Sequence, residues 1–137
     1  MSLMVFLSSC TGADDPDLVY GLTLSPTGID PHINASSELG IPLQSVYDTL
    51  IFRDPESGEF IPGLAKSWTL SDDELQLTLT LREDVQCHDG TPFNAQAVQA
   101  NFERILNPDN RSQKALSLLG PLHSVTADGD FIVSLHL

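Results

Sequence analysis

The clearest pattern in the chain is a strict alternation of apolar and polar side chains between residues 75 and 82. Successive side chains of an extended strand point to opposite faces, so an alternating segment places its leucines on one side. The alternation therefore predicts a strand that is buried on one face only. The apolar face carries Leu75, Leu77, Leu79 and Leu81, and the polar face carries Gln76, Thr78, Thr80 and Arg82.

Three further segments have the composition of strands. Residues 17–25, DLVYGLTLS, form an apolar run that ends at Ser25-Pro26, which predicts a buried strand. The SWTLS segment predicts another strand, with Trp68 as a core anchor beneath the sheet rather than a platform for a ligand. Residues 124–137 predict a hairpin that turns at Asp128-Gly129. Its second strand presents one apolar face, made of Phe131, Val133, Leu135 and Leu137.

Two segments follow the helical period instead. In residues 42–52 apolar side chains recur at i, i+3, i+4 and i+7 behind Pro42, which predicts a short amphipathic helix. Asn94 precedes AQAVQANFERIL and is expected to be the N-cap of a longer helix, because its side-chain oxygen can accept a backbone N–H. The apolar positions are Leu43, Val46, Tyr47 and Leu50 in the first helix, and Val98, Phe102, Ile105 and Leu106 in the second.

The remaining segments predict loops. Residues 26–41 carry Pro, Gly, Asn and Ser at short intervals, which predicts a long irregular loop, and RDPESGEFIPG at 53–63 predicts a turn. Strands and helices thus mix along the chain. The last residues fall inside a predicted strand, so we expect the sequence to be a piece of a longer protein.

The composition is that of one domain with an acidic surface. The 137 residues are 41% hydrophobic and 18% charged, which is enough apolar material for a core. The 19 acidic side chains outnumber the 6 basic ones, and the net charge is -13. Such a surface repels phosphate backbones, so we expect no nucleic-acid partner. The acidity favours either a cationic ligand or, more simply, a solvated surface that repels its own copies.

The first ten residues, MSLMVFLSSC, predict a lipid anchor. Leu7-Ser8-Ser9-Cys10 matches the lipobox of bacterial lipoproteins, and TGADDPD after it suits a polar tether. A basic start is missing and the apolar part is short, so the segment is either a trimmed signal peptide, which we favour, or an accidental match. No apolar run is long enough to span a membrane. Acyl chains on Cys10 would hold the protein at a membrane surface, at ~0.8 kcal/mol per buried methylene.

Cys87 is expected to be a buried, inert thiol. A Cys10–Cys87 disulfide is possible but poorly motivated, because Cys10 would lie in a flexible tether.

His88-Asp89 allows two interpretations. Adjacent His and Asp ligate metals in HD-type phosphohydrolases, which present them from helices with further ligands. Here Gly90 and Pro92 predict a strand-to-helix turn around the pair, and the other histidines show no ligand spacing such as H-x-x-x-H. We therefore expect the Asp89 carboxylate to bond to backbone N–H groups, with no metal and no catalytic residue.

Several separated blocks resemble family 5 of the bacterial extracellular solute-binding proteins, the peptide-, dipeptide- and nickel-binding components of ABC importers. That family has a Leu-Ala-x-Ser-Trp step, an aspartate turn, an alternating strand ending in Leu-Arg, and a His-Asp-Gly-x-Pro turn that runs into a helix. The resemblance covers residues 18–137, and the lipobox agrees with it. The matching blocks are Leu64-Ala65, Ser67-Trp68, Asp72-Asp73, Leu81-Arg82, His88-Asp89-Gly90 and Pro92.

The chain departs from the family pattern in three places. Cys87 stands where the family prefers an aromatic residue, which agrees with a buried apolar site. Glu74 replaces a turn glycine, so the turn is expected to be wider or slightly strained. Gln96 and Ala97 replace acids that favour the first turn of a helix. Family members are also much longer than this chain.

The resemblance implies the N-terminal part of a two-lobed periplasmic-binding-protein-like fold. The class is α/β, and α+β for this portion, with a mixed sheet and short helices. Residues 1–16 would be the lipobox remnant and tether, residues 17–44 the start of lobe I, and residues 45–137 a small subdomain packed on that lobe.

The resemblance also implies how ligand is held. Two lobes close around a solute through contacts to both, and the closed form docks on a permease. Most gripping groups belong to later sequence. In this chain the positions expected at the cleft are Asn34, Ala35, Ser36 and Leu39, and in the nickel-binding branch also Gln113 and Leu116. That branch can place aromatic or basic residues at the last two positions, so Gln113 and Leu116 weaken a metal-complex interpretation.

The leading hypothesis is an extracytoplasmic lipoprotein, anchored through Cys10, that captures oligopeptides or dipeptides for ABC permease subunits. We expect it to be a monomer when complete, to need no cofactor, and not to be an enzyme. The alternatives are a nickel or metal-chelate binder of the same family, a metal-dependent hydrolase built on His88-Asp89, and a secreted holdase-like module with an exposed apolar surface.

Overall fold

The computed structural model describes Gly21, residues 28–33 and residues 40–137. Cys10, the strand predicted at 17–25 apart from Gly21, and the four loop positions Asn34, Ala35, Ser36 and Leu39 lie outside the described residues. The elements follow in the order α1 Gly40–Gln44, β1 Ile51–Arg53, β2 Phe60–Pro62, β3 Ala65–Leu70, β4 Gln76–Leu81, α2 Ala95–Leu106, η2 Pro108–Asn110, α3 Gln113–Leu119, β5 Ser124–Ala127 and β6 Ile132–His136.

Four antiparallel strands form the main sheet, in the order β3-β4-β6-β5. One of its two inner strands, β4, is the alternating segment, and it pairs Leu79 with Trp68 of β3 and with Val133 of β6. Leu79 and Leu81 are buried, which confirms the predicted apolar face. Leu75 is an exception: it lies before β4 and is 57% exposed.

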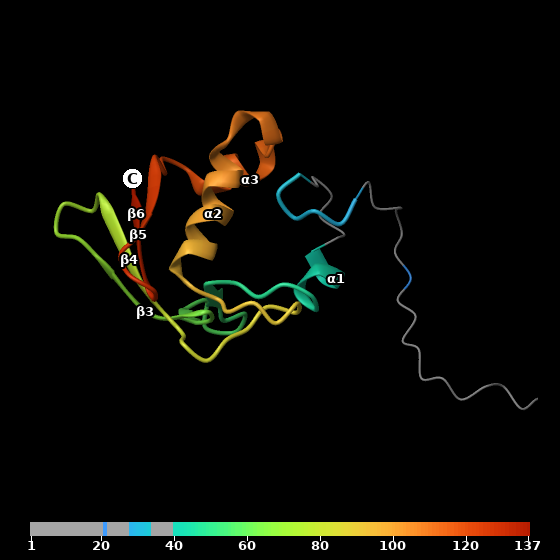
Figure 1. The fold of residues 1–137 in the computed structure, drawn as a ribbon, viewed down its shortest axis with the longest axis horizontal. Helices are drawn as coiled ribbons and strands as arrows, with labels where there is room; N and C mark the ends of the chain where they lie inside the picture. Colours follow the sequence, from blue (N-terminus) through green and yellow to red (C-terminus); the bar gives the residue numbers. More distant parts are fainter. Residues whose placement is uncertain (1–20, 22–27, 34–39) are drawn as a thin grey trace, which may run out of the picture.

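Helix α2 covers one face of this sheet (Figure 1). It begins where the sequence predicted, because the Asn94 Oδ1 accepts a hydrogen bond from the Ala97 N–H at 2.8 Å. Three hydrogen bonds tie its first half to the β5–β6 hairpin. In these bonds the Ala95 N–H donates to the Asp130 carbonyl at 2.8 Å, the Gln96 amide to the Gly129 carbonyl at 3.1 Å, and the Ala127 N–H to the Gln99 side chain at 2.9 Å.

One hydrophobic core lies between α2 and the sheet. Trp68 is half-buried and packs against this core, as expected of an anchor, and the apolar face predicted for β6 also contacts it. Leu106, predicted for the buried stripe of the helix, is only half-buried. The buried apolar members are Ala65, Leu79, Leu81, Ala95, Val98, Phe102, Leu122, Val125 and Val133.

The helix predicted at 42–52 is confirmed only for residues 42–44 and is wrong for the rest. Helix α1 ends at Gln44, and the chain enters strand β1 at Ile51. The carbonyls of Thr49 and Leu50 accept hydrogen bonds, both at 2.9 Å, from the Leu64 and Ala65 N–H groups at the start of β3. Ile51 and Phe52 also pair with Pro62 and Ile61 of β2, so these residues are extended, and tertiary pairing overrides the local apolar period.

Gly63 makes that pairing possible. A Cβ at this position would lie only 2.4 Å from the Thr49 carbonyl oxygen, which is closer than any side chain tolerates. Only glycine lets the two backbone segments approach to hydrogen-bonding distance here.

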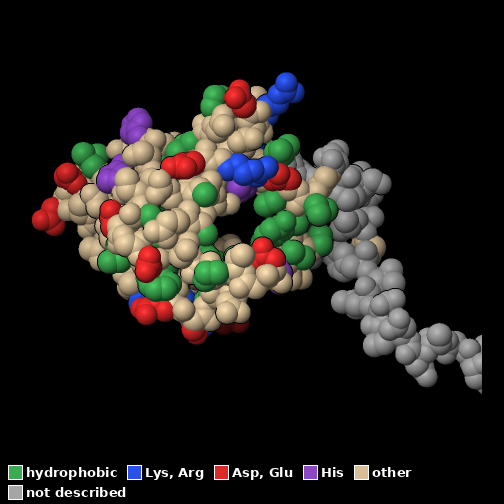
Figure 2. All heavy atoms as spheres, in the orientation of Figure 1, with side chains coloured by type: hydrophobic (Ala, Val, Ile, Leu, Met, Phe, Trp, Pro, Cys, Tyr) green, Lys and Arg blue, Asp and Glu red, His purple; other side chains and the backbone are tan. Residues whose placement is uncertain are grey.

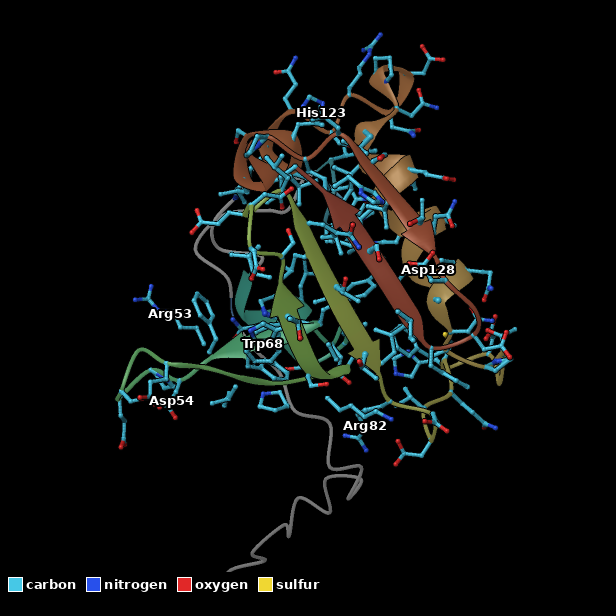
Figure 3. All side chains as sticks on the ribbon, turned by 90° about the vertical axis from the view of Figure 1, so that its left-hand side faces the viewer. Arg53, Asp54, Trp68, Arg82, His123 and Asp128 are labelled. Atoms are coloured by element: carbon cyan, nitrogen blue, oxygen red, sulfur yellow. The ribbon has the colours of Figure 1, made fainter. Side chains whose placement is uncertain are left out.

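The β1–β2 hairpin forms a separate two-stranded sheet. The predicted turn at 53–63 therefore contains strand β2 as well, and the turn proper is residues 54–59. The Asp54 carboxylate organises it by accepting from the Glu56 N–H at 2.9 Å and the Ser57 N–H at 2.8 Å, which lowers the pKa of Asp54. Figure 3 shows Arg53 and Asp54 at the outer end of this hairpin, away from the main sheet.

Two tight turns close the other hairpins. Glu74, in the β3–β4 turn, has a φ of 58°, so the strain expected from a residue in place of glycine is present. The β5–β6 turn contains Gly129 at a φ of 89°, close to the predicted Asp128-Gly129 position. Among the described helices, none has the length and apolar character of a membrane span.

Candidate functional site

His88 and Asp89 lie in a hydrogen-bonded turn between β4 and α2. The Asp89 Oδ1 accepts from the Thr91 N–H at 2.9 Å and from the Thr91 hydroxyl at 2.7 Å. The Cys87 N–H donates to the Thr91 carbonyl at 2.8 Å, and Gly90 provides the φ of 85° that the bend requires. The two bonds from Thr91 lower the pKa of the Asp89 carboxyl. Asp89 therefore holds the turn together, as predicted.

The turn does not gather a set of metal ligands. His88 is exposed, and within the described ranges no group of three His, Cys, Asp or Glu side chains is arranged to hold an ion. The described part of the chain thus offers the pair no further ligands of the kind that HD-type hydrolases use.

Cys87 is exposed, so the expectation of a buried thiol is wrong. The side chain belongs to the rim of the turn, where the backbone is bonded to Thr91 and the core cluster is filled by other residues. Occupying a position that the family gives to an aromatic residue did not guarantee burial. The sequence contained no signal that distinguishes a buried from an exposed cysteine at this position.

Two other motif residues, Leu64 before β3 and Arg82 after β4, connect these two strands through a backbone hydrogen bond. The Arg82 N–H donates to the Leu64 carbonyl at 2.9 Å, and its guanidinium pairs with Asp84 at 3.0 Å. Both side chains of that ion pair are exposed, so the pair adds little stability. In Figure 3, Arg82 and His123 lie at opposite ends of the sheet, and Trp68 lies near the β1–β2 hairpin.

A cavity with a volume of about 430 Å³ adjoins the turn at His88-Asp89. It lies between the segment before β1, the first half of α2 and the turn after β4, and its walls are mainly apolar. Figure 2 shows a hollow bordered by hydrophobic side chains, with basic, acidic and histidine side chains along one edge. Its lining includes Val46, Tyr47, Leu50, Leu64, Phe93 and Val98.

A second cavity of about 340 Å³ adjoins the first, and Tyr47 and Asn101 line both. Here the 28–33 segment meets the last turns of α2 through Arg104. The Arg104 guanidinium contacts both oxygens of the Asp30 carboxylate, Nη2 to Oδ2 at 2.5 Å and Nη1 to Oδ1 at 3.2 Å. Its Nη1 also lies 2.6 Å from the His32 Nδ1.

This cluster is the part of the site that sequence reasoning missed. The hydrogen bonds from Arg104 lower the pKa of Asp30 from 3.8 to about 2. Burial, followed by the charge of Arg104, lowers the pKa of His32 below 6.5. Asp30 and Arg104 are 74 positions apart, so no local spacing pointed to the pair.

The remaining predicted ligand residues lie on α3. Gln113 opens this helix and is exposed, and Leu116 is half-buried. Neither residue lines either of the two cavities described above. Their role in holding a solute stays a prediction.

Comparison with known proteins identifies the family. Residues 59–137, more than half of the chain, match the family profile described as bacterial extracellular solute-binding proteins, family 5 Middle. The nickel-binding periplasmic protein of Escherichia coli K12 is 34% identical over 110 residues, which cover 80% of this chain and 20% of that protein. The glutathione-binding protein GsiB of Salmonella typhi is 36% identical over 98 residues, covering 72% of this chain and 19% of that protein.

The fold agrees with solved members of the same group. NikA from Brucella suis, crystallised with Fe(III)-EDTA, superposes with a TM-score of 0.76 at 30% identity, over 90% of this chain and 24% of that one. The mixed α/β fold with short helices is therefore that of a periplasmic binding protein. The chain spans about a fifth of the length of the curated relatives that it matches. On the profile match and these identities together, the chain belongs to family 5 of the bacterial extracellular solute-binding proteins.

Proposed function

We propose that this chain acts as the N-terminal part of a solute-binding protein that captures oligopeptides or dipeptides outside the membrane and delivers them to an ABC permease. Membership of family 5 carries this proposal. The described fold is a small sheet-and-helix unit with its core complete between α2 and the main sheet. In this interpretation residues 45–137 form the subdomain and residues 17–44 the start of lobe I.

Peptide is the proposed solute because of the chemistry of one relative and of this chain. GsiB is named for glutathione, which is a tripeptide. Peptides present a free amino group, and a chain with a net charge of -13 attracts cations. Asn34, Ala35, Ser36, Leu39, Gln113 and Leu116 are the positions of this chain proposed to approach the bound solute.

A metal chelate is the second candidate. The names of two similar proteins favour it, since one binds nickel and another was crystallised with Fe(III)-EDTA. The described residues contain no three-ligand cluster of their own, so a bare ion would depend on other groups. A pre-formed chelate, which brings its own ligands, fits this alternative better.

The turn at His88-Asp89 supports a binding role rather than an enzymatic one. The Asp89 Oδ1 is engaged by Thr91 through two hydrogen bonds, and among the described residues no hydrogen bond orients the His88 ring. A general base needs such a partner or a matched acid to work on substrate. We propose that the pair is architectural.

The proposed location is the outer face of the cytoplasmic membrane or the periplasm. Leu7-Ser8-Ser9-Cys10 supports an acylated anchor at Cys10, and family membership supports an extracytoplasmic site. Labelling with an alkyne-bearing fatty acid tests the anchor. Incorporation that disappears in Cys10→Ser supports it, whereas labelling of Cys10→Ser, or no labelling of the native sequence in a bacterial host, contradicts it.

Calorimetric titration of the complete polypeptide that contains this sequence tests the solute. The ligands compared are a dipeptide, a tetrapeptide, glutathione and the nickel–histidine complex. We expect binding of at least one peptide at micromolar or tighter Kd. Binding of the nickel complex alone would transfer the proposal to the metal-chelate candidate.

The 137-residue chain alone provides the matched control. Solute in this fold is trapped between two lobes, so contacts from a single lobe leave most of the binding energy unrealised. We expect no micromolar peptide binding by this chain in the same titration. Tight binding would show that the contacts lie within these residues. Hydrolysis of a phosphate ester with added divalent metal, abolished by His88→Ala, would overturn the binding function.

A further inference from the structure

The 28–33 segment is attached to α2 by a compact group of polar contacts. The Arg104 guanidinium contacts both carboxylate oxygens of Asp30 and the His32 Nδ1, and the His32 N–H donates to the Asp30 Oδ1 at 2.9 Å. The Asn101 side chain adds a hydrogen bond to His32. The Arg104 carbonyl is itself held by the Asn110 side chain at 2.9 Å. We call Asp30, His32 and Arg104 the clasp.

The geometry fixes the protonation state of His32. Arginine has five N–H donors, no acceptor, and keeps its charge. The Arg104 Nη1 contact of 2.6 Å with the His32 Nδ1 is therefore a hydrogen bond only when Nδ1 carries a lone pair. Neutral His32 with its proton on Nε2 satisfies this condition. Protonated His32 places a second donor against Nη1 and a second positive charge beside the guanidinium.

The other groups around His32 do not remove this conflict. Asp30 favours a protonated imidazole, but both of its oxygens are already bound by Arg104. Tyr47, from the segment that follows α1, lines the same cavity and contributes an aromatic ring with a hydroxyl group. Asn101 carries no charge, and its hydrogen bond raises the pKa of His32 less than burial and Arg104 lower it. Arg104 is thus the charged group of α2 that opposes protonation, and burial acts in the same direction.

We propose that Asp30, His32 and Arg104 form a pH-sensitive clasp, which holds the 28–33 segment on α2 while His32 is neutral and opens when His32 is protonated. The contact uses the lone pair of Nδ1, so a single proton converts a hydrogen bond into a repulsion. The sign follows from the lowered pKa of His32: docking is complete above 6.5 and is lost as the pH falls below it.

One consequence rests on the proposed function. Residue 33 leads directly into Asn34, the first of the positions proposed to approach solute. Release of the 28–33 segment is then expected to weaken solute binding by the complete protein in acid. The clasp itself requires no solute, so it can be tested separately.

Long-range proton–nitrogen NMR of the histidine rings in the 137-residue chain tests the clasp. We expect His32 to be the neutral tautomer with its proton on Nε2 at about pH 7.5, and to titrate below the value of an unperturbed imidazole. Backbone amides of residues 28–33 and of the last turns of α2 are expected to shift with the same midpoint. His88, His123 and His136, which lie outside the clasp, supply reference curves in the same spectra.

Two variants and one control separate the clasp from a merely structural contact. Arg104→Gln keeps a donor but removes the charge, so the His32 midpoint is expected to rise. His32→Asn replaces Nδ1 with an amide oxygen that accepts but does not titrate, so the coupled amide transition of the 28–33 segment is expected to disappear. Arg82→Gln removes the guanidinium of the exposed ion pair with Asp84 and is expected to change neither result.

The clasp is overturned if His32 carries its proton on Nδ1 at neutral pH, or if its titration midpoint is at or above 6.5. The clasp is also overturned if the amide chemical shifts of the 28–33 segment do not change with pH at the His32 midpoint. The tautomer is measured in the native sequence, so the test stands even if Arg104→Gln does not fold. Loss of peptide binding at every pH, with an intact clasp transition, would count against the proposed function alone.

Discussion

The four-stranded sheet with α2 and the segments before it differ in how they use apolar side chains. All the buried apolar side chains of the described residues lie between Ala65 and Val133. The described residues before Gly63 instead expose large apolar side chains, including Phe60, which is 68% exposed, and Ile29, which is 72% exposed. The first region contains the buried core, although Leu75 and Leu118 are exposed in it, whereas the second adds only the partly buried Leu50 and Ile51 to that core.

The difference explains which region specifies its own structure. In the main sheet, the alternating pattern of β4, the N-cap of α2 and the core all favour the same arrangement. In the earlier region, local pattern and tertiary contacts disagree, and backbone hydrogen bonds from β3 decide the outcome. Exposed apolar surface of this extent usually marks an interaction site. We therefore expect stability to be concentrated in the sheet and α2.

Truncating one side chain in each region gives the largest contrast. Leu79 is 1% exposed, so Leu79→Ala is expected to lower the free energy of unfolding by roughly 2–5 kcal/mol through lost burial and a new cavity. Phe60→Ala, at the exposed hairpin, is expected to change it by less than about 0.5 kcal/mol. Denaturant unfolding measures both. Equal losses would show that the hairpin belongs to the same cooperative core, and Leu79→Val offers a milder variant if Leu79→Ala does not fold.

Removing the N-cap of α2 probes the region whose local signals agree. Asn94→Ala leaves the Ala97 N–H without its side-chain acceptor and is expected to cost about 1 kcal/mol of stability. Asn94→Ser keeps an acceptor oxygen and serves as the control, with most of the loss restored. Far-ultraviolet circular dichroism during unfolding follows the helix. An unchanged stability in Asn94→Ala would mean that packing alone fixes the start of α2.

The Asp30–Arg104 ion pair connects the two regions and predicts a dependence on pH. The folded pKa of Asp30 is about 2, below its ordinary 3.8, so its stabilising effect is complete above 3.8 and is lost as the pH falls towards 2. The two side chains are 35% and 40% exposed, so solvent screening limits the effect to about 1 kcal/mol or less. Unfolding of the native chain and of Asp30→Asn is expected to differ at neutral pH and to converge in acid. A difference that widens in acid would contradict this sign.

The smallest expected effect on the free energy of unfolding concerns the β3–β4 turn of the main sheet. Glu74 has a φ of 58°, so Glu74→Gly relieves backbone strain but adds freedom to the unfolded chain. We expect a net stabilisation of a few tenths to about 1 kcal/mol. Asp72→Gly, at an exposed position of the same turn without a positive φ, is the control and is expected to destabilise. A loss of stability in Glu74→Gly would mean that the side chain contributes more than the strain costs.

The sequence predicted the main sheet better than the segments around it. The leucine alternation of β4, the apolar face of β6 and the Asn94 cap are local patterns that match their tertiary surroundings, so all three predictions are confirmed. Asp89 was also placed correctly, because turn chemistry acts within a few residues. Strain at Glu74 was predicted because Glu74 replaces a turn glycine of the family pattern, and its positive φ agrees with this prediction.

The rest depended on contacts between distant residues. The helix predicted at 42–52 ends at Gln44 because the chain beyond it pairs with β2 and with the start of β3, and Gly63 permits the second of these contacts. Burial of Cys87 was inferred from a preference at that position, although burial is decided by what packs over it. The clasp joins two segments that are far apart in the sequence and follow no common pattern. The sequence therefore did not predict the contact between Asp30 and Arg104.

Because the strands lie in the order β3-β4-β6-β5, the inner strand β4 is synthesised long before one of its neighbours. Strand β6 leaves the ribosome only after α2 and α3 have been made. Until then one edge of β4 has unpaired backbone groups, and the face bearing Leu79 and Leu81 is incompletely covered. Translation that stalls between α2 and β6 would therefore release a nascent chain prone to aggregation.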